Sequence, residues 1–273
     1  MIRGREPYLA QADWDRVDTS EDAAAYVAYL ERIDASPLIQ HYRQEFLGRL
    51  PCRPGERVLD AGCGVGGNAR RLWPLMNRTG RVLGVDASQR MIRRARTLAP
   101  GLSFSVGNLC HLPLASGSFD GVLCDRVLMH LSHPLDAVRE MVRVLRPGGW
   151  LGLCEPDWSR ARLEPDGEIS RIVLETHCSS FENGAIGGSL EELIEEAGCQ
   201  KMGFAERDHA VQDYEKIWSL VNMERSLRRA VETGKLSEGE VNQWRGQLEE
   251  AARGGRFYLS FAGAICMGRK REA

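Results

Sequence analysis

The sequence predicts an α/β protein with a mostly parallel sheet and helices on both faces. Two observations carry this prediction. Short runs of β-branched and aliphatic residues alternate with longer amphipathic segments between residues 57 and 156, which is the pattern of β-α-β units. The first of these runs leads through a glycine-rich turn into a helical segment, as at the ligand-binding edge of such sheets.

A length of 273 residues is enough for one large domain with a helical annex, and the composition is that of a globular protein. The formal charge of -2 gives no drive toward nucleic acid or an anionic membrane, so we expect neither as a partner. The N-terminus lacks an apolar core of signal-peptide length, and the longest apolar stretch, residues 257–267, is too short to span a bilayer. We therefore expect a cytoplasmic protein.

The 8 cysteines are scattered, with no C-x-x-C pair and no cysteine or histidine cluster at zinc spacing. In a reducing compartment such cysteines are small buried apolar residues. The sequence therefore predicts no metal site.

Apolar residues at helical spacing predict two helices over residues 19–50, the second following Pro37. The runs predicted as the first five strands are RVLDAGC (57–63), RVLGVDA (81–87), LSFSVGN (102–108), FDGVLCD (119–125) and WLGLCEP (150–156). The segments predicted as the helices between them are 66–73, 88–98 and 134–145.

After residue 160 a polar stretch leads to a predicted helix over 189–198 and a strand over 201–209. Two helices are predicted over 213–232 and 237–253, followed by a closing strand over 257–268. Neither a repeat nor a long linker divides the chain.

The glycine-rich turn after the first strand predicts a ligand site at the carboxyl edge of the sheet. Glycine allows the backbone to turn sharply and to approach a ligand closely. The next strand ends in Asp86, whose carboxylate can accept hydrogen bonds from the two hydroxyls of a ribose. Gly62, Gly64 and Gly67 also fit G-x-G-x-x-G, so on these residues alone a dinucleotide oxidoreductase stays open.

Residues around the turn favour another cofactor that carries adenine and an ammonium group. Asp60 stands where dinucleotide-binding strands are usually apolar, and a carboxylate there can pair with an ammonium group. After the third strand, the Asn108 side chain can accept a hydrogen bond from the adenine amino group, and Leu109 can pack on the ring.

Four segments then carry a resemblance to a known family: VLDAGCGVGG, VLGVDAS, GNLCHLPLASGSFDGVL and RVLRPGGWL. In this order and spacing they resemble the motifs of class I S-adenosylmethionine-dependent methyltransferases, in the domain group that includes quinone and natural-product enzymes. The resemblance covers residues 57–156. It implies a Rossmann-like sheet of seven strands, in which segments 201–209 and 257–268 form the final hairpin and the last strand is antiparallel.

The residues that the resemblance assigns to S-adenosylmethionine are Asp60, Gly62, Gly64, Gly66, Asp86, Ala87, Met91, Asn108, Leu109 and Arg126. It implies that Asp60 and the glycine turn hold the methionine part and that Asp86 holds the ribose. Ala87 and Met91 are implied to pack on the adenine. At Asn108 the family more often has Asp, so one charge-assisted hydrogen bond is missing. Arg126 can clamp the cofactor carboxylate or a substrate anion, or else form an ion pair with Asp125.

Two residues past the fourth and fifth strands are candidates for orienting or deprotonating the acceptor. His130 stands where the family often has a histidine near the methyl donor, so it is the candidate base or acceptor-orienting group, although a hydrogen bond within its loop is an open alternative. Glu155, after the fifth strand, is the second candidate. Tyr26, Tyr29 and Tyr42 can cap the pocket, or can simply form the core-facing stripe of their helices.

We expect an N-terminal helical cap over residues 1–50, a cofactor-binding core over 51–160, and the remainder of the same sheet over 161–273. A helical insert over about 212–253 is expected to form, with the cap, the lid over the acceptor.

The leading functional prediction is a methyltransferase for a small-molecule acceptor, such as a natural product. A second hypothesis is a protein of the same fold that binds S-adenosylmethionine without methyl transfer, in a cyclase-like or regulatory role. Methylation of RNA or protein is disfavoured by the neutral charge and by the absence of N-P-P-Y or D-P-P-Y after the fourth strand. Arsenite methylation is suggested by Cys63 in GCG but opposed by Ala185, where that family has a thiol. The acceptor and the oligomeric state stay open.

Overall fold

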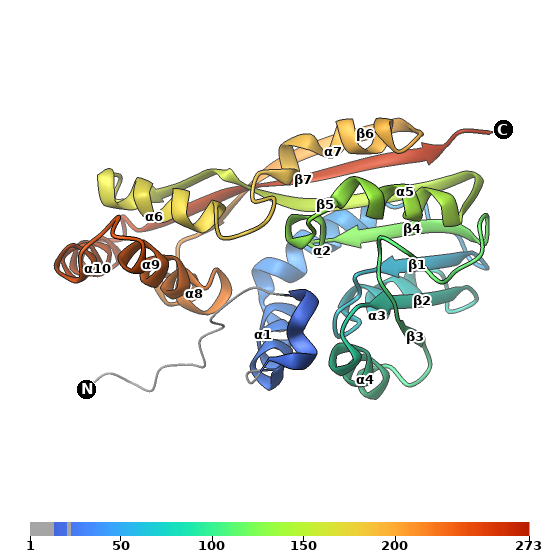
Figure 1. The fold of residues 1–273 in the computed structure, drawn as a ribbon, viewed down its shortest axis with the longest axis horizontal. Helices are drawn as coiled ribbons and strands as arrows, with labels where there is room; N and C mark the ends of the chain where they lie inside the picture. The colour runs from blue at the N-terminus through green and yellow to red at the C-terminus, as the bar shows by residue number, and fades with distance from the viewer. Residues whose placement is uncertain (1–13, 21–22, 273) are drawn as a thin grey trace.

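The computed structural model describes residues 14–20 and 23–272, and its centre is a seven-stranded sheet (Figure 1). The strands are β1 (Arg57–Ala61), β2 (Arg81–Asp86), β3 (Ser103–Val106), β4 (Phe119–Asp125), β5 (Leu145–Glu164), β6 (Cys199–Val211) and β7 (Tyr258–Lys270). Their order across the sheet is β3-β2-β1-β4-β5-β7-β6. Strands β1 to β5 pair in parallel, whereas β7 is antiparallel to both of its neighbours. The predicted fold class is confirmed, including the antiparallel last strand.

Helices cover both faces of this sheet because the strands bury side chains on both sides. The helices of the core are α2 (Pro37–Arg49), α3 (Gly67–Leu75), α4 (Gln89–Leu98), α5 (Pro134–Val144) and α7 (Leu190–Glu196). Within β1, Val58 belongs to the apolar cluster formed with α2, α3 and α4. Its neighbour Leu59 belongs to the cluster formed with α5 and α7. This alternation is the period of two expected of a strand buried on both faces.

The N-terminal segment packs beside the carboxyl ends of the strands. It begins with a short 3-10 helix, η1 (Trp14–Thr19), followed by α1 (Ala23–Ala35). The Asp18 carboxylate accepts hydrogen bonds from the Ser88 hydroxyl (2.8 Å) and the Gln89 N–H (2.6 Å) at the start of α4. The two helices predicted for residues 19–50 are thus present as α1 and α2. The first 13 residues of the expected cap lie outside the described residues.

The far end of the molecule is carried by the two longest strands. β5 runs well past the parallel part of the sheet and stays paired with β7 as far as Glu164, opposite Tyr258. The helices gathered at this end (Figure 1) are α6 (Glu168–Cys178), α8 (Tyr214–Leu220), α9 (Met223–Glu232) and α10 (Glu238–Arg253). Two short 3-10 helices complete the fold, η2 (Leu128–His130) and η3 (Ile186–Ser189).

Three elements differ from the sequence-based expectation. α6 falls in the stretch expected only to be polar, because its buried face mixes apolar Ile172 and Val173 with polar Ser170, Thr176 and His177. β5 is much longer than the predicted strand. The helix predicted over 213–232 is two helices, interrupted at Asn222, whose φ of 55° is left-handed.

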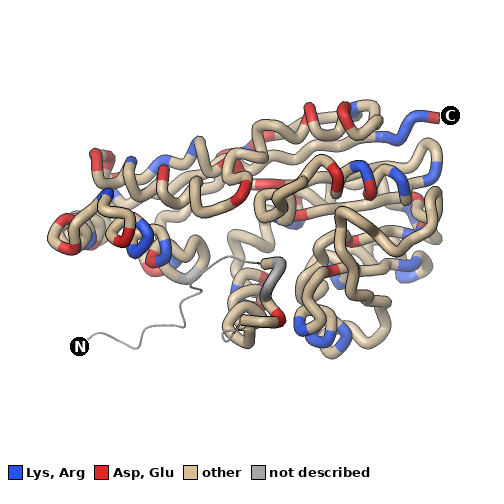
Figure 2. Tube along the Cα trace, viewed as in Figure 1, with Lys and Arg blue, Asp and Glu red and all other residues tan. Residues whose placement is uncertain are grey.

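Charged side chains of both signs are distributed along the chain (Figure 2). Basic residues gather on α4, whose sequence QRMIRRARTL has four arginines on one short helix. Two of them have partners: Arg94 pairs with Glu31, and Arg96 donates to the Phe104 carbonyl. The part of the chain that the structure describes contains no helix long and apolar enough to cross a membrane.

Candidate functional site

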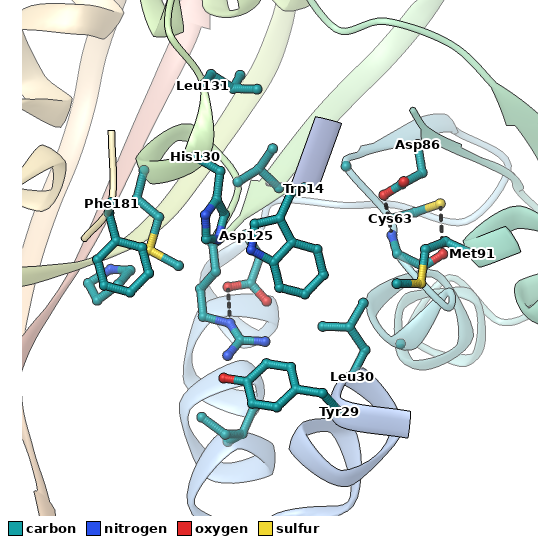
Figure 3. Close-up of a pocket in the computed structure, with 18 of the residues that line it drawn as sticks. Trp14, Tyr29, Leu30, Cys63, Asp86, Met91, Asp125, His130, Leu131 and Phe181 are labelled. Atoms are coloured by element: carbon teal, nitrogen blue, oxygen red, sulfur yellow. Dashed lines mark hydrogen bonds and ion pairs between the residues drawn. The ribbon is translucent and has the colours of Figure 1, made fainter. Parts of the chain in front are cut away.

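A cavity of about 580 Å³ lies at the carboxyl ends of β1, β2 and β4. Residues of η1, α1 and α2 close one side of it, and residues around the junction of α8 and α9 contribute Leu220, Val221, Asn222 and Arg225. Figure 3 shows Asp86, Cys63 and Met91 at one end and His130 and Phe181 at the other, with Trp14 between them. The cavity therefore brings together the predicted cofactor residues and a second group of side chains far away in sequence.

The glycine turn is held by backbone hydrogen bonds to the neighbouring strand. The N–H groups of Gly62 and Cys63 both donate to the Val85 carbonyl, at 2.8 and 3.0 Å. Gly62 and Gly64 have φ values of 75° and 50°, which favour glycine. A Cβ atom at Gly62 would also overlap the Val127 side chain. Glycine is thus required here both by the backbone and by the close approach of the loop after β4.

Asp86 joins this turn to the start of α4. Its carboxylate accepts one hydrogen bond from the Gly64 N–H (2.8 Å) and one from the Ser88 N–H (2.9 Å). Burial raises the pKa of Asp86, and these two hydrogen bonds oppose that shift. Since each carboxylate oxygen has a further lone pair, Asp86 can still accept from two hydroxyl groups.

The predicted adenine residues lie next to Asp86. Ala87, Met91, Asn108 and Leu109 all line the cavity. The Asn108 side-chain oxygen already accepts a hydrogen bond from the Cys110 N–H at 2.8 Å, so one lone pair is left for a ligand. We call the glycine turn, Asp86 and these four residues the cofactor half of the cavity.

Two predicted cofactor residues, Asp60 and Gly66, do not line the cavity. The fully buried Asp60 accepts a hydrogen bond from the Ala69 N–H (3.0 Å) at the start of α3, and burial raises its pKa to about 7. Gly66 precedes α3 with a φ of 79° and lies against the Phe104 ring. In this structure both residues shape the turn, and neither lines the cavity.

A buried ionic network ties the N-terminal helices to the sheet beside the turn. Arg43 of α2 pairs with Asp34 and with Asp125, its Nε lying 3.2 Å from the Asp125 carboxylate. The same Asp125 oxygen accepts a hydrogen bond from Asn68 Nδ2 at 3.0 Å. The other Asp125 oxygen, Asn68 Oδ1 and Arg126 Nε have no hydrogen-bond partner among the described residues. These three atoms, on residues that line the cavity, are where a ligand with charged groups can bind.

The position of Glu155 calls for a correction. Instead of facing an acceptor, it is fully buried beneath the loop after β4, and one carboxylate oxygen accepts the N–H groups of Val127 and Leu128, both at 2.7 Å. Burial raises its pKa to about 8. Glu155 does not line the cavity, and its visible role is to fix the loop that presents Arg126 and His130.

His130 lines the cavity at the end of this loop. Its ring lies 5.3 Å from that of Trp14 and 5.6 Å from that of Phe181, centroid to centroid. Burial lowers its pKa to about 3, and the charges of Arg126 and Arg225 act in the same direction. His130 is thus a neutral imidazole at physiological pH, and it lies beside Phe181 at the end of the cavity opposite Asp86 (Figure 3).

Beyond His130 the cavity is bounded by four rings, here called the aromatic wall: Trp158, His177, Phe181 and Phe261. They come from β5, α6, the loop after α6 and β7. The Trp158 ring lies 4.5 Å from the His177 ring and 4.7 Å from the Phe261 ring. Only the position of Trp158 directly after the fifth strand could have indicated it, since the others depend on how distant elements pack.

Two of the three N-terminal tyrosines reach the cavity. Tyr29 and Tyr42 line it, and the Tyr29 hydroxyl donates a hydrogen bond to the Leu220 carbonyl at 2.9 Å, which links α1 to the end of α8. Tyr26 instead packs edge-on against Trp14, at 5.2 Å between centroids. Cys63 lines the cavity as a buried thiol, and the described residues contain no group of three potential metal ligands.

Two family models match parts of the chain. The model of methyltransferase domains matches residues 59–153, and that of protein-L-isoaspartate(D-aspartate) O-methyltransferases matches residues 5–103. The first match spans β1 to β5, which includes the glycine turn, Asp86 and His130.

The chain is similar to several known proteins. It is 34% identical over 223 residues to an uncharacterized 37.1 kDa protein in transposon TN4556 of Streptomyces fradiae, covering 80% of this chain and 65% of that protein. It is 36% identical over 121 residues to a demethylmenaquinone methyltransferase of Beutenbergia cavernae, covering 43% of this chain and 49% of that protein. The chain thus spans less than two thirds of the length of these relatives.

Among solved structures, phosphoethanolamine N-methyltransferase 2 of Haemonchus contortus, in complex with S-adenosyl-L-methionine, has the same fold. The TM-score is 0.62 at 18% identity, over 96% of this chain and 60% of that chain.

Proposed function

We propose that the chain, whose residues 59–153 match the family model of methyltransferase domains, is a class I S-adenosylmethionine-dependent methyltransferase that transfers a methyl group to a small-molecule acceptor. The cofactor of this family is S-adenosylmethionine. The observation that carries the proposal is the single continuous cavity in which the cofactor half meets the aromatic wall. An enzyme of this kind needs both ligands in one enclosed space, with the acceptor atom aligned on the methyl group.

The residues of the cofactor half fit this cofactor. In our proposal Asp86 accepts the ribose hydroxyls, and Ala87, Met91 and Leu109 pack on the adenine. The Gly62–Gly64 backbone approaches the methionine part. The unpaired atoms of Asn68, Asp125 and Arg126 suit its ammonium and carboxylate groups, which need acceptors and a donor respectively. Asp60 and Gly66 support the turn from behind.

When bound, the cofactor would supply an electrophilic methyl group to the electron pair of the acceptor and would leave as the thioether, and any proton on the acceptor atom would pass to water. The chain's own contribution is to align the acceptor and to exclude water. We propose that His130, a neutral imidazole beside both ligand regions, orients the acceptor atom by a hydrogen bond. Because its pKa is about 3, an orienting role suits it better than that of a strong base.

We further propose that the N-terminal helices and residues 212–253 form the lid. Two observations support this: Tyr29 and Leu220 join the two segments by a hydrogen bond, and residues from both line the cavity. Opening of this contact is expected to admit and release the ligands.

The first test is calorimetric titration of the whole chain with S-adenosylhomocysteine, with NADH as the control. Binding of S-adenosylhomocysteine and not of NADH is expected, and the reverse result would overturn the proposal. Turnover is then measured as S-adenosylhomocysteine formed over a panel of phenols, quinols, carboxylic acids and amines. An isoaspartyl peptide belongs in the panel because the second family model matches residues 5–103. Cofactor binding with no product from any acceptor would favour a protein that binds S-adenosylmethionine without methyl transfer.

A further inference from the structure

The aromatic wall contains two buried polar atoms that no described residue satisfies. His177 Nε2 and Trp158 Nε1 both lack a hydrogen-bond partner, although both side chains are more than nine-tenths buried and line the cavity. Their rings are in edge-to-face contact at 4.5 Å between centroids. Buried polar atoms are rarely left unpaired in native proteins, so two of them on adjoining rings indicate a place for a polar group of a ligand.

The other ring nitrogen of His177, Nδ1, has a hydrogen-bond partner in the protein. Its Nδ1 lies 2.9 Å from the Ser226 hydroxyl of α9. Burial, assisted by the charge of Arg225, lowers the pKa of His177 to about 3, so the ring is neutral at physiological pH. The Ser226 hydroxyl can accept from Nδ1 or donate to it, so Nε2 offers a lone pair in one tautomer and an N–H in the other, whereas the indole N–H of Trp158 can only donate.

The rest of the wall is flat and apolar. Phe181 lies 5.2 Å from His177 and is nearly parallel to Trp158, with an interplanar angle of 7°. Phe261 contacts Trp158 from β7. Ring faces of this kind bind a planar aromatic ligand by stacking and edge contacts.

We propose that the aromatic wall binds an acceptor with a flat ring that bears a hydroxyl group, and that this hydroxyl pairs with His177 Nε2 and Trp158 Nε1. A hydroxyl can donate one hydrogen bond and accept two, so it can pair with both nitrogens in either tautomer of His177. This inference rests on the proposed function, because it names the class of acceptor for the same site. His177 is then a residue that selects and positions the acceptor.

The competing chemistry is an anionic acceptor, because Arg126 and Arg225 also line the cavity. Arg225 has a partner in the protein, and Arg126 is assigned above to the carboxylate of the cofactor. Arg126 lies 3.8 Å from the Asp125 carboxylate, and Arg225 donates to the Ser180 carbonyl at 3.0 Å. The unpaired atoms of the aromatic wall are neutral, so the observations favour an uncharged hydroxyl there.

The test compares three ligands of similar shape on the whole chain saturated with S-adenosylhomocysteine: 2-naphthol, 2-methylnaphthalene and 2-naphthoate. Dissociation constants are measured by calorimetry. We expect 2-naphthol to bind about tenfold more tightly than 2-methylnaphthalene, because only the hydroxyl satisfies the buried atoms. Equal affinities for these two, or tighter binding of 2-naphthoate, would overturn the proposal.

Two variants test whether the preference for 2-naphthol over 2-methylnaphthalene depends on His177. His177→Phe keeps a flat ring but removes the ring nitrogen Nε2, and we expect the preference for 2-naphthol to disappear. His177→Gln restores an acceptor and is expected to recover part of the preference. A preference that persists in both variants would also overturn the proposal.

Affinity for S-adenosylhomocysteine serves as the control for folding. Both variants are expected to retain it, because His177 lies outside the cofactor half. If the parent chain does not bind S-adenosylhomocysteine at all, the proposed function fails. The comparison of the naphthalenes is then run without it and still decides the inference about the wall.

Discussion

At the glycine-turn end of the cavity, the glycine turn, the Asp86 carboxylate and the polar side chains of Asn68, Asp125 and Arg126 line the space for a ligand. At the other end four rings do, and the histidines there are held neutral by burial. The first end is built within residues 60–126, by β1, β2, β4 and the turns that follow them. The second is assembled from β5, α6 and β7, which lie further along the chain.

The contrast shows how one fold can combine a fixed cofactor with a variable acceptor. Polar groups that recognise a nucleoside need fixed positions, and the carboxyl ends of adjacent parallel strands provide them. A wall of rings recognises shape and area, which depend on how distant elements pack. The cofactor half and the aromatic wall are therefore expected to respond to different mutations.

The largest expected effect is the loss of cofactor affinity in Asp86→Ala. Two hydrogen bonds to a charged carboxylate contribute about 1.5–3 kcal/mol each, so affinity for S-adenosylhomocysteine is expected to fall by about a hundredfold or more. Asp208→Ala, on the exposed surface of β6, is the matched control and should bind as the parent does. Calorimetric titration measures both, and retained affinity in Asp86→Ala would contradict the assignment of the cofactor half.

The opposite result is expected for Phe181→Ala, in which activity on the acceptor should fall while affinity for the cofactor is retained. Loss of ring contacts with His130, Trp158 and His177 should lower kcat/KM for the acceptor by about tenfold, because each aromatic pair contributes about 0.5–1.5 kcal/mol. Affinity for S-adenosylhomocysteine should change less than about twofold. Phe204→Ala on β6, a phenylalanine outside this cavity, is the control. A parallel loss of cofactor affinity would show that the two ends are not separable.

Glu155 lies beneath the loop that joins the two ends of the cavity. Its raised pKa predicts that the stability of the folded protein depends on pH. Its pKa is raised to about 8 in the folded protein, so the stability linked to its protonated form is present below its ordinary pKa. That stability is lost as the pH rises from about 4.5 to about 8, on the order of 1 kcal/mol for each pH unit.

The comparison between Glu155→Gln and the parent isolates this effect. Urea unfolding at pH 5 and pH 8 should show a smaller fall in the free energy of unfolding for the variant, because the amide does not ionise. Asp60, with a pKa of about 7, is expected to contribute the fall that remains. The same pH dependence in both proteins would refute the assignment to Glu155.

The smallest expected effect is that of Tyr29→Phe, which removes the hydrogen bond to the Leu220 carbonyl. One neutral hydrogen bond contributes about 0.5–1.5 kcal/mol, so dissociation of S-adenosylhomocysteine should be faster by a few-fold. Stopped-flow fluorescence can measure this rate. An unchanged rate would mean that this contact does not hold the lid closed.

The cofactor half could be predicted from the sequence because its parts are local. The glycine turn, the acid at the end of β2 and the order of strands and helices all follow from short motifs and from periodicity. Glu155 was misassigned because a carboxylate at a strand end can face the ligand or support the neighbouring loop, and only the fold decides between them.

The aromatic wall could not be predicted for a different reason. α6, which carries His177, mixes polar Ser170 and Thr176 with apolar Ile172 and Val173 on its buried face, so its apolar stripe is interrupted. Its burial depends on contacts with α9 and β5, which periodicity does not reveal. Ser226 became recognisable as the partner of His177 only once both helices were placed.

The pairing of β6 with β7 also has an evolutionary consequence. Val211 at the end of β6 is paired with Leu259 at the start of β7, so the segment 212–257 leaves and re-enters the sheet at neighbouring positions. A segment with adjoining ends can be lengthened, shortened or exchanged without a shift in strand register. Relatives of this chain can therefore diversify here by insertion and recombination while the cofactor half stays unchanged.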